Sequence, residues 1–351
     1  HSAMIKIRGS KDSTTALMAY PAFGYPSGAY WRIHVSGVIS QSPAVFSMRQ
    51  RMMIRMLGGV MQATPDQMQG KMFQERIKPF MAEGDHRQSI VVTFNGSEYR
   101  LKKKTRRNGH FDDSFVIDRD QIDSVSTVVG GTAQIKLLVS TETQTNQPVE
   151  CIAKLYPTRG ISVVSDIDDT IKDSMVTDRR ELLANTFLRE FRSVDGMSDV
   201  YRQWEANGAG FHYVSSSPWQ LFQSLQQMHS IHDFPNGTMH LRNFRLRDQL
   251  LKRIILRRKG KATEIKRLME YMPERDFILV GDSGEKDPKI YLKMCRHFGD
   301  RVKGVFIREI AERPLETEVF RKLQASTAAG NCKKFSTARE LANLSSEIFT
   351  Q

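Results

Sequence analysis

The stretch ISVVSDIDDTIKD, residues 161–173, carries the strongest indication of fold in this sequence. Its first five residues are mostly apolar and β-branched, which is typical of a buried strand, and acidic residues follow where that strand would end. Asp166 and Asp168 are two residues apart, so in an extended chain their carboxylates point the same way. At the carboxyl end of a parallel strand they would face the crevice where ligands bind in open α/β sheets.

Two other interpretations compete for the same stretch. Acidic residues are common in the turns that follow strands, so DxDxT alone does not establish a site. A calcium-binding EF-hand loop also begins with spaced acids, but it needs glycine at its sixth position and glutamate at its twelfth. These positions are Ile171 and Thr177 here, which argues against an EF-hand.

Three further segments favour a site over a plain turn. FHYVSSSPW at 211–219 predicts a second buried strand that ends at Ser215, and RKGKATEIKRLME at 258–270 places Lys261 at the start of an amphipathic helix. FILVGDSGEKDP at 277–288 predicts a third strand followed by Asp282 and Asp287. Strands that alternate with helices predict an α/β fold with a Rossmann-like, doubly wound parallel sheet, which would bring these side chains to one edge.

The ordered set resembles the four motifs of the haloacid dehalogenase phosphatase superfamily. More narrowly, DIDDTIK, YVSSSPWQL, KATEI and FILVGDSGEKDP are similar to the catalytic domain of the actin-patch-associated phosphatidate phosphatases of fungi and their bacterial relatives. NGHF at 108–111 and the β-rich first part of the chain match that family too. Asp169 departs from the DxDGT of many superfamily members, but the narrower family also has DIDDT, so this residue does not argue against activity.

The resemblance implies a Mg²⁺-dependent phosphatase in which Asp166 attacks phosphorus and Asp168 acts first as acid and then as base. The implied catalytic residues are Asp166, Asp168, Ser215 and Lys261. The implied metal ligands are Asp166, Asp168 (through its backbone carbonyl), Asp282 and Asp287, and the implied substrate-binding residues are Thr170, Ser215, Ser216 and Lys261. Such an all-oxygen site suits Mg²⁺. Thr170 and Asp287 are expected mainly to orient the loop and the metal's water molecules.

The letters GDSG at 281–284 also fit the nucleophilic serine of a chymotrypsin-like protease. Such a serine belongs to an all-β domain whose histidine and aspartate precede it in the chain. The α/β pattern around GDSG favours the phosphatase, in which Asp282 works and Ser283 is a neighbour without a nucleophilic role.

Alternating strands predict a β-rich, sandwich-like first domain at 5–156, before a catalytic domain at 157–351. Residues 1–4 look like a remnant of cloning. SIVVTF and EYRL flank an Asn95-Gly96 turn, and QIKLLVS at 134–140 predicts another strand. A helix at about 44–57 carries four methionines among arginines; it could lie in a membrane interface, but its apolar residues surround the helix, so we expect buried packing.

A net charge of +13 favours an anionic partner: nucleic acid, an anionic membrane surface or a phosphorylated substrate. The densest basic runs are 101–107 and 241–261, and most such runs are solvated surface. Apart from Phe244, these two runs lack the interleaved aromatic residues of nucleic-acid modules.

Three distant cysteines predict no disulfide framework and a reducing compartment. With no apolar run of membrane-spanning length, we expect a cytoplasmic protein that is peripheral at membranes.

About 45 residues separate Asp166 from Ser215, which predicts a minimal cap and an open site. An open site suits a lipid head group or a large phosphoester. The family resemblance, more than the open site or the basic runs, implies phosphatidate as the substrate, with diacylglycerol and phosphate as products. A protein or inositol phosphoester is the alternative within catalysis, and a catalytically silent membrane-binding or scaffold protein is the alternative outside it.

Overall fold

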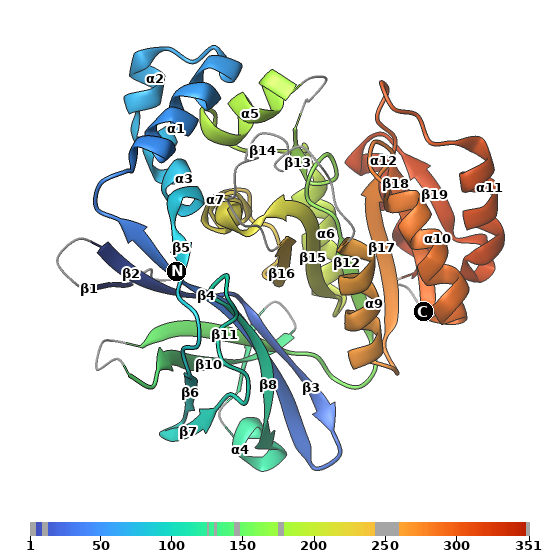
Figure 1. Ribbon diagram of the computed structural model, residues 1–351. Coiled ribbons are helices and arrows are strands. Elements are labelled where there is room, and N and C mark those ends of the chain that lie inside the picture. Colours follow the sequence, from blue (N-terminus) through green and yellow to red (C-terminus); the bar gives the residue numbers. More distant parts are fainter. Residues whose placement is uncertain are drawn as a thin grey trace. The chain divides into compact units, whose positions relative to one another are not determined.

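The computed structural model describes residues 5–8, 13–124, 126–129, 132–143, 148–174, 179–242 and 260–348. These residues form two compact units, each with its own large sheet, and the chain passes from the first to the second between Pro157 and Thr158 (Figure 1). Each unit is described by itself.

The first unit is built around one mixed sheet. Its strands are β1 (Ile5–Arg8), β2 (Ser13–Ala19), β3 (Ala22–Ser27), β4 (Tyr30–Pro43), β5 (Glu83–Gly84), β6 (Ile90–Phe94), β7 (Ser97–Arg100), β8 (His110–Asp118), β9 (Thr127–Val129), β10 (Thr132–Thr141) and β11 (Val149–Leu155). Among the described residues the strands run β1-β2-β4-β3-β11-β10-β6-β7, and β8 pairs with the other edge of β4. The helices of this unit are α1 (Met48–Met61), α2 (Pro65–Gln69), α3 (Lys71–Met81) and α4 (Arg119–Asp123).

A hydrophobic core packs against the sheet of the first unit. Alternate residues of β4, such as Ile33 and Val35, pack there with Phe115 of β8, Val92 of β6 and Leu137 of β10. Tyr99 of β7 and Phe115 of β8 belong to strands that do not pair, yet their ring centroids are 4.8 Å apart. The sheet therefore curves around its own core; the two-layer sandwich expected from the sequence stays a prediction.

The predicted Asn95-Gly96 turn is confirmed. β6 and β7 are antiparallel, and Phe94 pairs with Ser97 across the two turn residues. Both turn residues have positive φ, 46° at Asn95 and 80° at Gly96, which a two-residue hairpin with the right twist requires. QIKLLVS likewise lies within β10.

The methionine-rich helix differs from expectation in position and in exposure. It is α1, which begins after Ser47 with a reciprocal cap: the Ser47 hydroxyl accepts from Gln50 N–H, and the Gln50 side chain accepts from Ser47 N–H. Leu57 and Met61 are buried, but Met48 is 87% exposed. The expectation of buried packing was wrong for the outer face. Apolar residues surround α1, but only one side of the helix packs against other residues.

The second unit holds a parallel sheet in the order β16-β15-β12-β17-β18-β19 among the described residues. These strands are β12 (Ile161–Ser165), β15 (Gly210–Pro218), β16 (Thr238–Arg242), β17 (Asp276–Asp282), β18 (Val302–Arg308) and β19 (Cys332–Phe335). The helices are α5 (Arg179–Phe187), α6 (Met197–Ala206), α7 (Phe222–Ile231), α9 (Lys261–Tyr271), α10 (Asp287–Phe298), α11 (Thr317–Ser326) and α12 (Ala338–Ser345).

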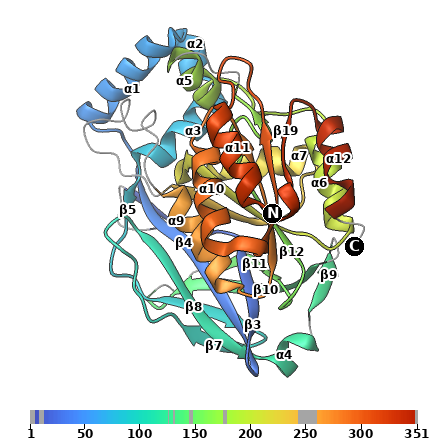
Figure 2. The ribbon, with the colours of Figure 1, turned by 90° about the vertical axis from the view of Figure 1, so that its right-hand side faces the viewer.

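Helices cover both faces of this parallel sheet. α9 and α11 each contact α10 on one side, and α6 contacts α12 on the other (Figure 2). The buried strand residues Val163, Phe211 and Leu279 fill the space between these layers and the sheet. The predicted α/β class and the parallel sheet are confirmed, and the arrangement is compatible with a Rossmann-like fold.

Between Asp166 and Ser215 the chain forms α5, α6 and a two-stranded ribbon of β13 (Lys172–Asp173) and β14 (Arg192–Ser193). The segment ELLANTFLREF, residues 181–191, overlaps α5. A minimal cap stays a prediction.

The two basic runs differ in what can be said of them. Lys102, Lys103 and Lys104 are exposed on the loop after β7. Most of the second run, 243–259, lies outside the described residues, as do residues 1–4. In the part of the chain that the structure describes, no helix combines the length and apolar character needed to cross a bilayer.

Candidate active site

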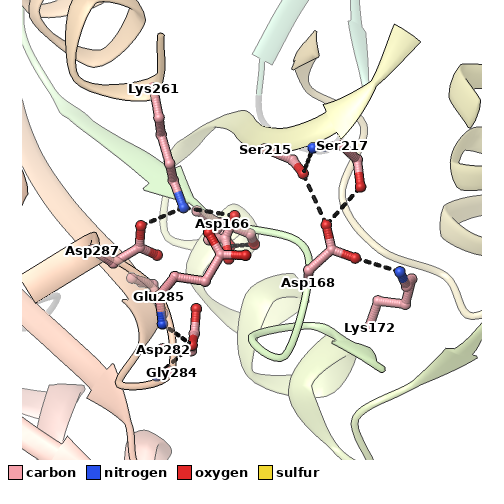
Figure 3. Close-up of polar contacts among 12 residues, drawn as sticks. Asp166, Asp168, Lys172, Ser215, Ser217, Lys261, Asp282, Gly284, Glu285 and Asp287 are labelled. Atoms are coloured by element: carbon pink, nitrogen blue, oxygen red, sulfur yellow. Dashed lines mark hydrogen bonds and ion pairs between the residues drawn. The ribbon is translucent and has the colours of Figure 1, made fainter. Parts of the chain in front are cut away.

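Asp166 and Asp282 come from neighbouring strands at the centre of the parallel sheet (Figure 3). β12 and β17 pair with Ser165 opposite Val280, and Asp166 N–H donates to the carbonyl of Val280 at 2.9 Å. Asp282 is the last residue of β17, and both aspartates are fully buried. After β12 the chain builds the sheet first towards β16 and then towards β19, so these residues lie at the switch point where such sheets bind ligands.

Lys261 bridges two of the buried carboxylates. Its Nζ lies 2.7 Å from Asp166 Oδ1 and 2.5 Å from Asp287 Oδ1. Burial alone would lower the pKa of Lys261, but the Asp166 and Asp287 carboxylates outweigh it and raise that pKa. Burial raises the pKa of Asp166, and Lys261 only partly opposes this. The ammonium is therefore permanently charged beside Asp166.

Asp287 reaches Lys261 because the residue at 281 is glycine. A Cβ at Gly281 would lie 2.3 Å from Asp287 Oδ2 and 2.7 Å from the Tyr291 hydroxyl, and both separations are too short for real atoms. Tyr291 cannot yield easily, since its hydroxyl donates to the Val280 carbonyl at 2.8 Å. The glycine before Asp282 thus serves the packing of α10 against β17.

Three carboxylates form a group that could hold a cation. Single oxygens of Asp166, Asp282 and Glu285 all lie within 4.8 Å of one another. Asp282 Oδ1 accepts from the N–H groups of Gly284 at 2.6 Å and Glu285 at 2.9 Å. Burial, with Asp287 and Glu285 nearby, raises the pKa of Asp282 to about 8. Oxygens in such a repulsive group suit a hard divalent cation.

The unsatisfied oxygens of this group support the same fit. Oδ2 of Asp166 and Oδ2 of Asp282 are buried and accept no hydrogen bond from the described residues. Buried polar atoms without partners are rare in folded proteins, and those found commonly mark an ion or a function. Asp287, an expected ligand, pairs with Lys261 instead of joining the group; its ligand role stays a prediction.

Asp168 lies in a separate set of contacts on the same loop. The hydroxyls of Ser215 and Ser217 donate to Asp168 Oδ2 at 3.0 and 2.7 Å, and the Lys172 ammonium donates to Oδ1 (Figure 3). Ser174 adds a longer hydroxyl contact to Oδ1 at 3.4 Å. Burial would raise the pKa of Asp168, but Lys172 and the two serine hydroxyls outweigh it and lower that pKa.

The loop between Asp166 and Lys172 owes its shape to Asp169. This residue has φ 58°, in the left-handed region that glycine adopts freely and aspartate tolerates better than most residues. Its carboxylate accepts from Ser174 N–H at 3.0 Å, and its carbonyl accepts from Arg308 at 2.7 Å. Aspartate can therefore hold this conformation, which glycine would adopt more freely.

The sequence-predicted residues divide between these sets. Asp166, Lys261, Asp282 and Asp287 lie together, and Ser215 lies with Asp168. Thr170 is buried, and its hydroxyl has no hydrogen-bond partner among the described residues. Ser216 makes no side-chain hydrogen bond within the same part of the chain. The proposed functions of all these residues stay predictions.

Sequence reasoning missed Lys172, Ser217, Glu285 and Arg308. The signal for Ser217 was present: β15 continues to Pro218, and residues two apart on a strand share a face, so Ser217 accompanies Ser215 and Ser216 points away. Lys172 follows Asp168 by four residues in a turn where Ile171 N–H donates to Ile167 O. Arg308 at the end of β18 offered no such signal.

The Ser283 hydroxyl is held by the loop that follows β18. It donates to the Arg313 carbonyl at 2.7 Å and accepts from Ile310 N–H at 2.8 Å. Both contacts are with backbone groups, which gives Ser283 a role in loop structure.

Comparisons with known proteins agree with this geometry. Residues 161–309 match the family model of the catalytic domain of phosphatidate phosphatase APP1. An uncharacterized protein of Schizosaccharomyces pombe is 27% identical over 242 residues, which are 67% of this chain and 37% of that protein. The phosphatidate phosphatase APP1 of Saccharomyces cerevisiae is 31% identical over 183 residues, 49% of this chain and 31% of that protein. The matched part is about a third of either relative's length.

Comparison with solved structures adds nothing to this. A carbohydrate esterase structure aligns over 95% of this chain and 97% of its own, but with 9% identity and a TM-score of 0.21. The family resemblance found in the sequence motifs is confirmed by the family match. Residues 161–309 of this chain are therefore similar to the catalytic domain of phosphatidate phosphatase APP1.

Proposed function

We propose that this chain is a Mg²⁺-dependent phosphatidate phosphatase that works through an aspartyl-phosphate on Asp166. The observation that carries the proposal is the position of Asp166, a buried carboxylate between the Lys261 ammonium and the carboxylates of Asp282 and Glu285. The family of residues 161–309 supports the substrate class. The relative from Saccharomyces cerevisiae is named as a phosphatidate phosphatase.

A carboxylate nucleophile needs positive charge because its target is also an anion. A phosphomonoester dianion and a carboxylate repel by about 4 kcal/mol per charge pair at about 4 Å with an effective dielectric constant of about 20. Lys261 provides one positive charge beside Asp166. The group of Asp166, Asp282 and Glu285 would hold the second, as Mg²⁺. When bound, Mg²⁺ would neutralise phosphoryl oxygens and orient them for in-line attack.

In the first step one Asp166 oxygen attacks phosphorus and the bond to the diacylglycerol oxygen breaks. The Asp168 carboxyl gives its proton to that oxygen, and diacylglycerol leaves. Lys172 and the serine hydroxyls favour ionised Asp168. A bound phosphate dianion adds negative charge nearby, which raises the pKa of Asp168 and permits the protonation that this step needs.

In the second step water attacks the phosphorus of the aspartyl-phosphate. Asp168, now ionised, accepts a proton from that water, and the bond between phosphorus and the Asp166 oxygen breaks. Inorganic phosphate leaves, and Asp166 is restored. We expect the Ser215 hydroxyl, which donates to Asp168 in the free protein, to turn towards a phosphoryl oxygen and stabilise its charge.

A phosphate-release panel tests the proposal. The purified full chain is assayed with Mg²⁺ on phosphatidate in mixed micelles and on glycerol 3-phosphate, an inositol phosphate and a phosphopeptide. We expect the highest rate on phosphatidate, reversible loss with excess chelator, and a raised Mg²⁺ requirement for Asp282→Ala. Rapid hydrolysis of the soluble substrates without any of phosphatidate would contradict the substrate, and rates unaffected by chelator would contradict the metal. No turnover on any substrate would leave the silent scaffold as the better account.

A further inference from the structure

Helix α1 presents an apolar stripe to solvent. Met48, Met52 and Met56 are 87, 59 and 55% exposed, and they are four residues apart, so they form a row along one side of the helix. Val45, just before the helix, is 69% exposed. These four residues are called the methionine face below. Single exposed apolar residues are ordinary on protein surfaces, but an aligned row of large ones indicates an interaction surface.

The methionine face is not needed to hold α1 in the first unit. The opposite side of the helix buries Leu57 and Met61, and the Gln50 side chain donates to the Met81 carbonyl at 3.0 Å. Gly58 lies against Met68, since a Cβ there would come within 2.8 Å of the methionine Cε. α1 thus packs against the first unit through one side, and its methionine face is left exposed to solvent.

The charged residues of α1 itself all have one sign. Arg51 and Arg55 are exposed and fall beside the row on one side, and Arg49 falls on the other. The helix sequence MRQRMMIRMLGGVM contains no acidic residue. Apolar side chains bordered by arginines match the layers of an anionic bilayer, in which acyl chains lie beneath phosphate-bearing head groups. Methionine is flexible, so these side chains can adapt to the irregular packing of a fluid surface.

We propose that the methionine face of α1 inserts into the interface of an anionic membrane, with Arg51 and Arg55 against the lipid phosphates. The contact requires no catalytic step, so it stands or falls independently of the hydrolysis proposed above. It supplies the chain with a means of reaching a bilayer surface without a membrane-spanning helix. Exposed Lys102, Lys103 and Lys104 in the same unit add charge of the same sign.

Binding to vesicles that lack phosphatidate tests this proposal. The full chain is mixed with phosphatidylcholine vesicles containing phosphatidylserine, and the bound fraction is measured by flotation. The triple variant Met48→Asp, Met52→Asp, Met56→Asp should bind about tenfold more weakly or worse, because the inserted surface becomes polar and anionic. The control is Val128→Asp, which places the same charge at a residue of β9 that is 71% exposed and should bind like the unchanged chain.

A depth measurement separates insertion from surface attraction. Tryptophan fluorescence of Met52→Trp should be quenched by brominated acyl chains, and that of Val128→Trp should change no more than the background of the three native tryptophans. Thermal unfolding of each variant shows whether the fold is intact. The proposal is overturned if the unchanged chain does not bind these vesicles, if the triple variant binds as tightly, or if bound Met52→Trp is not quenched. The last two results would instead favour a protein partner for this face.

Discussion

At the scale of single residues, Ser283 and Asp282 are neighbours with different surroundings. The Ser283 hydroxyl contacts two backbone groups of the loop after β18, whereas Asp282 lies in the carboxylate group with Asp166. Ser283→Ala should therefore keep its turnover and lose about 1–2 kcal/mol of stability with the two hydrogen bonds. Phosphate release and urea unfolding measure the two effects. If Ser283→Ala bound Mg²⁺ normally but were inactive, the result would instead support Ser283 as the nucleophile.

Asp168 and Lys172 form a second testable pair. Asp168→Asn should lower turnover about 10² to 10⁴-fold on an alkyl phosphate and less on an aryl phosphate, whose oxygen leaves without a proton. Lys172→Gln removes the cation that contacts Asp168, so we expect a smaller loss, about tenfold, with the same dependence on leaving group. Equal losses on both substrates would show that neither residue acts through the departing oxygen.

At the scale of elements, the junction of β17 with α10 depends on the absence of a side chain at Gly281. Gly281→Ala would push a methyl group into Asp287 and Tyr291, and release Lys261 from one of its two carboxylates. We expect turnover to fall about tenfold or more and stability to fall by about 1–3 kcal/mol. Gly59→Ala is the control, since a Cβ there meets nothing within 4 Å and alanine favours the helix. Unchanged activity in Gly281→Ala would mean that Asp287 does not position Lys261.

The elements that the sequence predicted well are those with a regular pattern. Apolar runs that end in polar residues identified β12, β15 and β17, and the parallel sheet then brought Asp166 and Asp282 together. Lys261 was found because Ile265 and Leu268 mark one face of α9, as expected. Such periodic signals depend only on local spacing.

The contacts that the sequence did not predict depend on how the chain turns after each element. Glu285 approaches Asp282 because the loop after β17 folds back, with its N–H donating to that carboxylate. Ser217 was missed because β15 was expected to end at Ser215, whereas the strand continues to Pro218. For α1, the sequence could not show which side would find a packing partner, so exposure of Met52 was not foreseen.

At the scale of the whole molecule, buried histidines make stability depend on pH. Burial lowers the pKa of His229 to about 3 from its usual 6.5, and burial with Arg106 nearby lowers that of His110 to about 4. As the pH falls, His229 therefore binds a proton in the unfolded chain before it does so in the folded chain. The stability that neutral His229 contributes is complete above pH 6.5 and is lost as the pH falls towards about 3. Within that range, each such histidine lowers the free energy of unfolding by about 1.4 kcal/mol for every unit by which the pH falls.

Urea unfolding at several pH values isolates the contribution of His229. Its ring packs edge-on against Tyr213 with 4.4 Å between ring centroids, and it lies on α7. Between pH 6.5 and 4.5, His229→Gln should lose less stability than the unchanged chain, although it is less stable at pH 7. Parallel curves for the two proteins would show that His229 does not stay neutral in the folded state.

The account as a whole depends on Asp166 as the residue that receives the phosphoryl group. The most direct measurement is acid quenching of the Mg²⁺-loaded chain during turnover of phosphatidate labelled in its phosphate, followed by borohydride reduction and mass spectrometry of the peptides. An acyl phosphate is reduced at the carbonyl carbon, so a phosphorylated Asp166 becomes homoserine at position 166. The account predicts labelled protein at early times, homoserine at that position alone, and neither in Asp166→Asn. Label on Ser283, or turnover by Asp166→Asn, would contradict it.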